Sequence, residues 1–304
     1  MSGTDTIYSM ITDRIIAALD KGTVPWRKTW RGGSEGMPAS LKSKKAYRGI
    51  NTFVLTLQQQ VMGYSSRYWL TFKQAKDLKG SVRKGEKGTP VIFWKLLRKE
   101  DKDATTGETK KRTIPMLRYY TVFNVEQCDG ITCPEATTKP EGLQFNPIKA
   151  CEDMVAGYHN APTLQHVEQR AWYRPDSDTV NMPKSDTFES VEAYYSTLFH
   201  ELAHSTGHKS RLDRDGIKSI GFGSELYSKE ELVAEMSAAM LCGLCGIDNA
   251  AVIDNAVGYI AHWRSKLQDD PKLLICAAAN AQKACDHVRG IKYSEDKADD
   301  NSED

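Results

Sequence analysis

The sequence contains no long apolar run, and this absence excludes a helix that crosses a membrane. Such a helix needs about 20 consecutive, mostly apolar residues, and no stretch of that length in the 304-residue chain is apolar. The first ten residues, MSGTDTIYSM, also lack the basic start and the apolar stretch of a secretory signal. We therefore expect a cytoplasmic protein that has no membrane partner.

A disulfide framework is also absent. The seven cysteines are odd in number and scattered along the chain, unlike the paired cysteines of small secreted domains. Cys242 and Cys245 form a C-x-x-C pattern, but their surroundings, AAMLCGLCGI, are apolar and no second pair completes a zinc cage. We interpret both as small core residues of a packed helix.

Net charge is nearly absent too, but its formal value of +1 hides an asymmetry. Residues 21–120 carry 23 lysines and arginines against 7 acidic residues, whereas residues 121–304 carry 17 against 30. A basic front segment suits a polyanionic partner. A lysine-rich solvated surface would have the same composition, so charge alone leaves both interpretations open.

The spacing of apolar residues predicts an α+β protein with two domains. We expect a small α+β domain over residues 1–128, a linker over 129–146, a mainly helical domain over 147–290 and a disordered tail over 291–304. In the front half, the pattern predicts helices over 7–19 and within 47–64, a hairpin within 82–100 and a strand over 117–128. It also predicts an exposed polar loop over 99–113. The back half is predicted to hold two short strands within 171–183 and three amphipathic helices, which carry FHELAHSTGH, SKEELVAEMSAAMLCGL and NAVGYIAHWRSKL.

The first of these helices carries the pattern His-Glu-x-x-His at residues 200–204. Residues four apart share a helical face, so His200 and His204 can offer two imidazoles to one metal ion. Glu201 lies beside them and is typical of the glutamate that takes a proton from metal-bound water in zinc peptidases. Because five-residue patterns also occur by chance, a third ligand is needed to support the interpretation.

A third histidine is a weak candidate for that ligand. The metzincin pattern requires a histidine six residues after His204, where this chain has Ser210. His208 is closer, but Gly207 is expected to end or bend the helix before it. We therefore expect His208 to be a neighbour of the site.

Acidic residues of the next helix are better candidates. The pattern E-x-x-A-E-x-x-A places Glu231 and Glu235 on one helical face. We assign Glu231 as the third ligand and Glu235 as the carboxylate that orients a ligand histidine, with the reverse assignment as the alternative. Glu231 could instead merely complete a capping box with Ser228 at the helix start. Tyr259 or His262 is a further candidate for stabilising an oxyanion.

The front half mixes cations and aromatic rings in five stretches, which include PWRKTWR and SSRYWLTFKQAK. Aromatic stacking combined with a charged groove is how proteins bind single-stranded nucleic acid without sequence preference. No helix-turn-helix, zinc finger or other motif that reads a duplex is present. Individual aromatics such as Trp69 and Phe72 could equally be core residues. The candidate DNA-binding residues are Trp26, Arg27, Lys28, Trp30, Lys44, Lys45, Arg48, Arg67, Lys73, Arg83, Lys84 and Lys87.

The two halves together resemble the ArdC-type antirestriction proteins of conjugative plasmids. The front half carries the resemblance in ITDRIIAALDKGTVPWRKTW, YRGIN, YWLTFKQAK and VRKGEKGTPVIFWK. The back half carries it in TLFHELAHSTGHKSRL, EELVAEMSAAML and YIAHWRSKLQDDPKLLICAAANAQKA. The resemblance covers nearly the whole chain except the tail.

This resemblance implies a single-stranded-DNA-binding domain joined to a zincin-like metallopeptidase domain that holds Zn²⁺ or another divalent metal. It implies protection of incoming plasmid DNA from restriction in the recipient cell. The protein substrate is unknown, and host restriction machinery is one candidate. Two alternatives remain: a DNA-coating protein with a structural metal, and a DNA-tethered processing peptidase unrelated to restriction.

Overall fold

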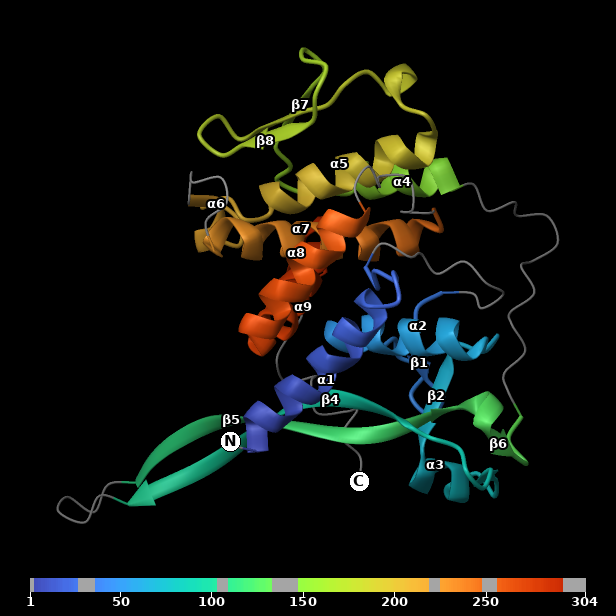
Figure 1. Ribbon diagram of the computed structural model, residues 1–304. Coiled ribbons are helices and arrows are strands. Elements are labelled where there is room, and N and C mark those ends of the chain that lie inside the picture. Colours follow the sequence, from blue (N-terminus) through green and yellow to red (C-terminus); the bar gives the residue numbers. More distant parts are fainter. Residues whose placement is uncertain are drawn as a thin grey trace.

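The computed structural model describes residues 3–26, 36–102, 109–132, 147–218, 225–247 and 256–291 (Figure 1). The fold is α+β, as predicted: the longer strands belong to the front half, and helices dominate the back half. None of the helices in these ranges is long and apolar enough to cross a membrane. Most of the predicted linker, from residue 133, and the tail from residue 292 lie outside the described residues.

The front half is built around a four-stranded sheet in the order β1-β2-β5-β4. Strands β1 and β2 are parallel, whereas β2, β5 and β4 pair antiparallel. Helix α2 lies against β4, where the Asn51 amide accepts from the backbone N–H of Ile92 and donates to its carbonyl. The elements are α1 (Gly3–Leu19), β1 (Ala39–Ser40), α2 (Ile50–Met62), β2 (Tyr68–Thr71), α3 (Phe72–Asp77), β3 (Ser81–Val82), β4 (Thr89–Lys102), β5 (Thr109–Asn124), a 3₁₀ turn (Val125–Gln127) and β6 (Cys128–Asp129).

The long β4–β5 ribbon corrects one prediction. Residues 99–113 were expected to form an exposed loop, but β4 continues to Lys102 and β5 begins at Thr109. Pairing extends from Thr89 opposite Val122 to Lys102 opposite Thr109. A polar sequence can form such a ribbon because the ladder needs only backbone donors and acceptors. The far end of the ribbon extends beyond the helices in Figure 1.

The back half stacks its helices beside a small three-stranded sheet in the order β7-β9-β8. Ser190 caps α5 by accepting a hydrogen bond from the backbone N–H of Ala193, and Asp270 caps α9 just before Pro271. The elements are α4 (Pro147–Ala156), β7 (Thr163–Gln165), β8 (Trp172–Arg174), β9 (Thr179–Asn181), a 3₁₀ turn (Ser185–Thr187), α5 (Val191–Ser205), α6 (Asp215–Lys218), α7 (Glu225–Cys245), α8 (Ala256–Asp269) and α9 (Pro271–Val288).

The capping box predicted for α7 is wrong. The helix already includes Glu225, so Ser228 lies inside it and is buried. Glu231 is therefore in the second turn of the helix, where its carboxylate has no role at the helix start. Cys242 and Cys245 are buried core residues further along α7, as predicted.

The two halves share one hydrophobic core. Helix α1 packs against α8 and α9, and its buried Ile11 and Ile15 belong to the same apolar cluster as Leu267 and Leu274. Trp26 joins this cluster with only 1% of its surface exposed. Front-half residues are thereby brought into contact with the helices that build the candidate site.

Candidate metal centre

Helix α5 presents the two motif histidines on one face, as their spacing predicts. The Nε2 atoms of His200 and His204 lie 3.1 Å apart. Both side chains are only partly exposed, at 26% and 13%. Two ring nitrogens this close favour a cation or a shared proton between them, because two neutral lone pairs repel.

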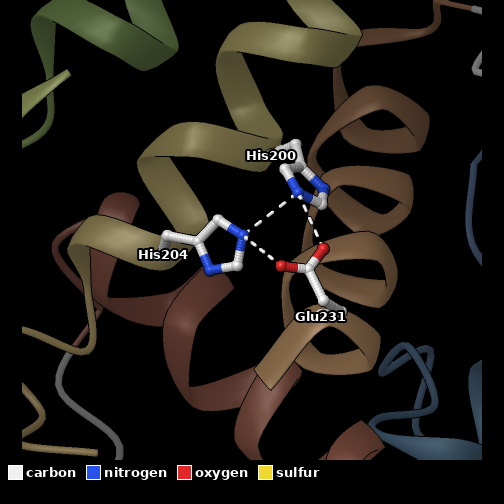
Figure 2. Close-up of side chains that lie close together, drawn as sticks. All are labelled: His200, His204 and Glu231. Atoms are coloured by element: carbon white, nitrogen blue, oxygen red, sulfur yellow. Dashed lines mark hydrogen bonds and ion pairs between the residues drawn. The ribbon is translucent and has the colours of Figure 1, made fainter. Parts of the chain in front are cut away.

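Glu231 completes the group from α7, which packs beside α5 (Figures 1 and 2). Its two carboxylate oxygens each lie 3.5 Å from a histidine Nε2, one from His200 and the other from His204. The three ligand atoms lie within 4.8 Å of one another, and the residues that the structure describes hold no other such group. The arrangement therefore brings the two predicted histidines together with the predicted glutamate.

The charges of this group are strongly coupled. Burial alone would lower the pKa of His200, but the carboxylates of Glu231, Glu201 and Glu235 outweigh it and raise the pKa to about 9. Burial raises the pKa of Glu231, but its hydrogen bond to His200 and the two imidazoles outweigh this and lower it to about 2. Excess negative charge thus surrounds the Nε2 atoms, which is the environment that a divalent cation needs.

The donor set fits a zinc-type ion. Zinc binds imidazole nitrogen and carboxylate oxygen at about 2.0–2.2 Å, and tetrahedral bonds of that length place ligand atoms roughly 3.3–3.6 Å apart. The observed separations of 3.1–3.5 Å lie close to that range. Two histidines and one carboxylate also leave one coordination position open, as in catalytic rather than structural sites.

A second carboxylate, which the sequence interpretation missed, orients His204. Oε1 of Glu230 lies 3.4 Å from Nδ1 of His204, whereas the other ring nitrogen, Nε2, faces Glu231. Arg214 holds Glu230 through two hydrogen bonds of 2.9 and 2.5 Å and also donates to the carbonyl of Ala203 at 2.8 Å. Burial raises the pKa of Glu230, but the ion pair with Arg214 outweighs it, so the pKa is lowered. Glu230 is therefore placed to accept a hydrogen bond from the Nδ1–H of His204, in the tautomer that leaves Nε2 available as a ligand.

Glu201 is buried beside the group. It is 8% exposed, and its charge acts on both His200 and Tyr227. Tyr227 stands one turn before Glu231 on α7 and hydrogen bonds its carboxylate. Burial, followed by the charge of Glu231, raises the pKa of Tyr227 to about 12. No feature of the sequence singled out this tyrosine.

Glu235 has two hydrogen-bond partners that the sequence did not predict. Its carboxylate accepts hydrogen bonds from the Nε1–H of Trp26, at 2.9 Å, and from the hydroxyl of Tyr259. The hydroxyl of Tyr259, the candidate for stabilising an oxyanion, is therefore hydrogen-bonded to Glu235. His208 lies outside the group, with its Nδ1 2.8 Å from the hydroxyl of Ser210.

The burial of Trp26 corrects a second prediction. A ring that is 1% exposed and packed edge-on against Trp263 has no face on which a base can stack. The expectation that Trp26 binds DNA is wrong in this arrangement. The indole belongs instead to the core beside the metal-site helix.

The other candidate DNA-binding residues differ in their environment. Arg48 is paired with Asp286, Arg83 is paired with Glu86 at 2.8 Å, and Arg67 lies over the ring of Tyr68. Lys44 approaches the same ring, so two cations flank Tyr68, at 4.9 and 5.0 Å from its centroid. Arg27, Lys28 and Trp30 lie outside the described residues. Among the candidate residues, the lysines that are exposed are Lys44, Lys45, Lys73, Lys84 and Lys87.

Comparisons with known proteins divide the chain in the same way. Residues 5–123 match the N-terminal domain of anti-restriction factor ArdC, and residues 151–280 match a zincin-like metallopeptidase family. The chain thus combines an ArdC-type front half with a back half of the zincin-like metallopeptidase class.

The relatives are similar over almost the whole chain. The crystal structure of antirestriction protein ArdC from plasmid R388, in its Mn(II)-bound form, is 39% identical, with a TM-score of 0.73 over 93% of this chain and 97% of that one. Its metal-free form is 40% identical, with a TM-score of 0.72 over 94% and 99% of the two chains. The chain belongs to the ArdC antirestriction family.

Two further relatives differ in length. A Sinorhizobium fredii (strain NBRC 101917 / NGR234) protein named y4eC is 37% identical over 92% of this chain and 90% of its own length. A DNA primase TraC of Escherichia coli is 36% identical over 95% of this chain. This chain spans only 27% of that primase, so the similarity concerns one part of the larger protein.

Proposed function

We propose that this protein binds single-stranded DNA and carries a metal-dependent, gluzincin-type peptidase site that protects incoming plasmid DNA from restriction in the cytoplasm of the recipient cell. The observation that carries the peptidase part is the convergence of His200, His204 and Glu231 beside the buried Glu201. Membership of the ArdC family supports the antirestriction part.

The residues have distinct roles in this chemistry. His200, His204 and Glu231 hold the metal, with Zn²⁺ as the expected ion and Mn²⁺ as an alternative that the Mn(II)-bound relative supports. A divalent metal held there would polarise the substrate carbonyl and lower the pKa of a bound water to about 7. Glu201 accepts a proton from the attacking water and then donates it to the leaving amine. Glu230 keeps His204 in the tautomer whose Nε2 faces the metal.

The front half supplies the DNA-binding part of the proposal. The flanking of Tyr68 by Lys44 and Arg67 combines a ring that can stack with cations that can hold phosphates. Phe72, 50% exposed beneath Lys76, offers a second such pair. Single-stranded binding of this type needs no groove that reads base edges.

Two other functions fit parts of the same structure. In the first, the protein protects DNA by coating it, and the metal only braces α5 against α7. In the second, the DNA-binding half delivers a processing peptidase to proteins unrelated to restriction, an idea that the resemblance to part of a DNA primase favours. The open coordination position favours catalysis over a purely structural metal.

Substitution of Glu201 separates these functions. A plasmid that carries restriction sites is transferred by conjugation into recipients with a restriction system, which express the wild type or Glu201→Gln, and transconjugants are counted. We expect Glu201→Gln to retain metal and DNA binding but to lose protection. Glu192→Gln, at a partly exposed position in the first turn of the same helix, is the matched control. Full protection by Glu201→Gln would contradict catalysis and support coating.

A further inference from the structure

A hydrogen-bonded group connects the front half of the chain to the metal-site helix. Glu235 lies one helical turn beyond Glu231 on α7, and its carboxylate accepts from Trp26 and Tyr259. The indole N–H of Trp26 also lies 2.8 Å from the hydroxyl oxygen of Tyr259. Three residues that are distant in sequence thus meet beside the metal-binding group.

The three residues come from both parts of the family architecture. Trp26 lies in the region that matches the ArdC N-terminal domain, whereas Glu235 and Tyr259 lie in the zincin-like region. Trp26 packs edge-on against Trp263, with ring centroids 6.3 Å apart and an interplanar angle of 89°. Tyr259 packs against the same tryptophan at 6.2 Å. Both donors are therefore held in place by the shared core.

Two donors on one carboxylate favour its ionised form. Glu235 shares α7 with the ligand Glu231, so a charge that is held on it lies beside the metal-binding group. A fixed negative charge one turn from a ligand also favours a divalent cation, because the interior screens charges weakly. Mobility or protonation of Glu235 would weaken that contribution.

We propose that Trp26 and Tyr259 are positioning residues of the metal centre, which hold the Glu235 carboxylate ionised and fixed so that the ArdC-type front half contributes directly to metal affinity. This inference rests on the proposed metal site. In a purely structural role, Trp26 would affect metal affinity only through the packing of its ring, whereas the proposal requires the hydrogen bond from its Nε1–H to Glu235.

The chain offers a matched control for that difference. Trp263 belongs to the same cluster and is 2% exposed, but its Nε1 finds no hydrogen-bond partner among the described residues. Both Trp26→Phe and Trp263→Phe shrink a buried indole, but only the first removes a donor to Glu235. A loss of packing affects both variants, whereas a loss of positioning affects only Trp26→Phe.

The test measures the affinity of the full-length chain for Zn²⁺ and Mn²⁺ by competition with a chromogenic chelator. Trp26→Phe and Tyr259→Phe are expected to weaken metal binding roughly tenfold each, within the about 10–100-fold range of outer-shell substitutions. Trp263→Phe should stay within about twofold of the wild type. In a Glu235→Gln background, Trp26→Phe should have little further effect, because the charge that it positions is gone.

Two outcomes would overturn the proposal. In the first, Trp26→Phe and Trp263→Phe lower the affinity equally, or Tyr259→Phe binds metal like the wild type. In the second, His204→Ala binds metal as tightly as the wild type; the metal site itself is then wrong, and the proposed function falls with it. Thermal unfolding of the metal-free variants identifies any that do not fold, and Tyr259→Phe then carries the test, because it keeps its ring and loses only the hydroxyl.

Discussion

Nδ1 of His204 lies 3.4 Å from Oε1 of Glu230, and Arg214 holds that glutamate from its other side. The imidazole is therefore bound at both nitrogens, with Glu230 at Nδ1 and the metal-binding group at Nε2. Carboxylate partners of this kind raise the basicity of a ligand histidine and fix its orientation.

Loss of this carboxylate should weaken the metal site. We expect Glu230→Gln to lower metal affinity by roughly 10–100-fold, because the uncharged amide stabilises the histidine ligand less well. Chelator competition on the full chain measures the effect. Glu192→Gln is the control, since Glu192 is partly exposed in the first turn of α5, the helix that carries His204. Equal affinities for the two variants would show that Glu230 does not support the ligand.

Metal binding should become tighter as pH rises towards 9. The pKa of His200 is raised to about 9 in the folded metal-free protein, so the metal must displace a proton from it. Calorimetry between about pH 6.5 and 10, in buffers of different ionisation enthalpy, should detect proton release that disappears above about pH 9. An affinity that is constant over this range would contradict the shifted pKa.

The same pKa shifts predict how the stability of the metal-free protein depends on pH. The raised pKa of His200 means that its charged form stabilises the fold below about pH 6.5, and this contribution is lost as the pH rises through about 9. The lowered pKa of Glu231 has the opposite sign: its contribution is present above about pH 4.5 and is lost as the pH falls through about 2. Urea unfolding over a range of pH, with a chelator for the metal-free protein, measures the free energy of unfolding in both the acid and the alkaline range. Saturating metal should abolish the alkaline loss.

Single-stranded DNA binding should depend on the exposed lysines of the front half. If Lys84 and Lys87 each contact one phosphate, Lys→Ala at either position should reduce the slope of log affinity against log salt by about 0.7. Lys283→Ala, at an exposed position of α9, is the matched control. Full-length protein is needed because α1 shares its core with α8 and α9. If the slope of log affinity against log salt is the same in all variants, Lys84 and Lys87 do not contact the DNA.

Stacking should depend on exposed rings rather than on the buried one. Phe72→Ala should weaken single-strand binding by about 1–3 kcal/mol, the usual cost of losing one stacked aromatic. Leu78 is also 50% exposed but has no ring to stack, so Leu78→Ala is the control. Fluorescence anisotropy with a labelled oligonucleotide measures both. If both variants lose a similar small part of the affinity for the oligonucleotide, Phe72 does not stack on the DNA.

The local parts of the site were predictable from the sequence, and the long-range parts were not. The four-residue spacing of His200 and His204 fixes their common face, and the acidic pattern on α7 was enough to select Glu231. Glu230 was missed because the crossing of α5 and α7, together with Arg214, determines that it also faces the site. The aromatic and basic surroundings of Trp26 indicated DNA, whereas tertiary packing gave that ring a partner on α7. The polar residues of 99–113 likewise predicted a loop, because the sequence does not show the backbone pairing between β4 and β5 that forms the ribbon.

Anomalous diffraction at the metal absorption edge, from crystals of the full chain loaded with Zn²⁺, tests the central claim most directly. We expect one ion bound by Nε2 of His200, Nε2 of His204 and the carboxylate of Glu231, with Glu235 still bound to Trp26 and Tyr259. An ion ligated by Glu235 in place of Glu231, or no ion between the two histidines, would contradict the proposed centre.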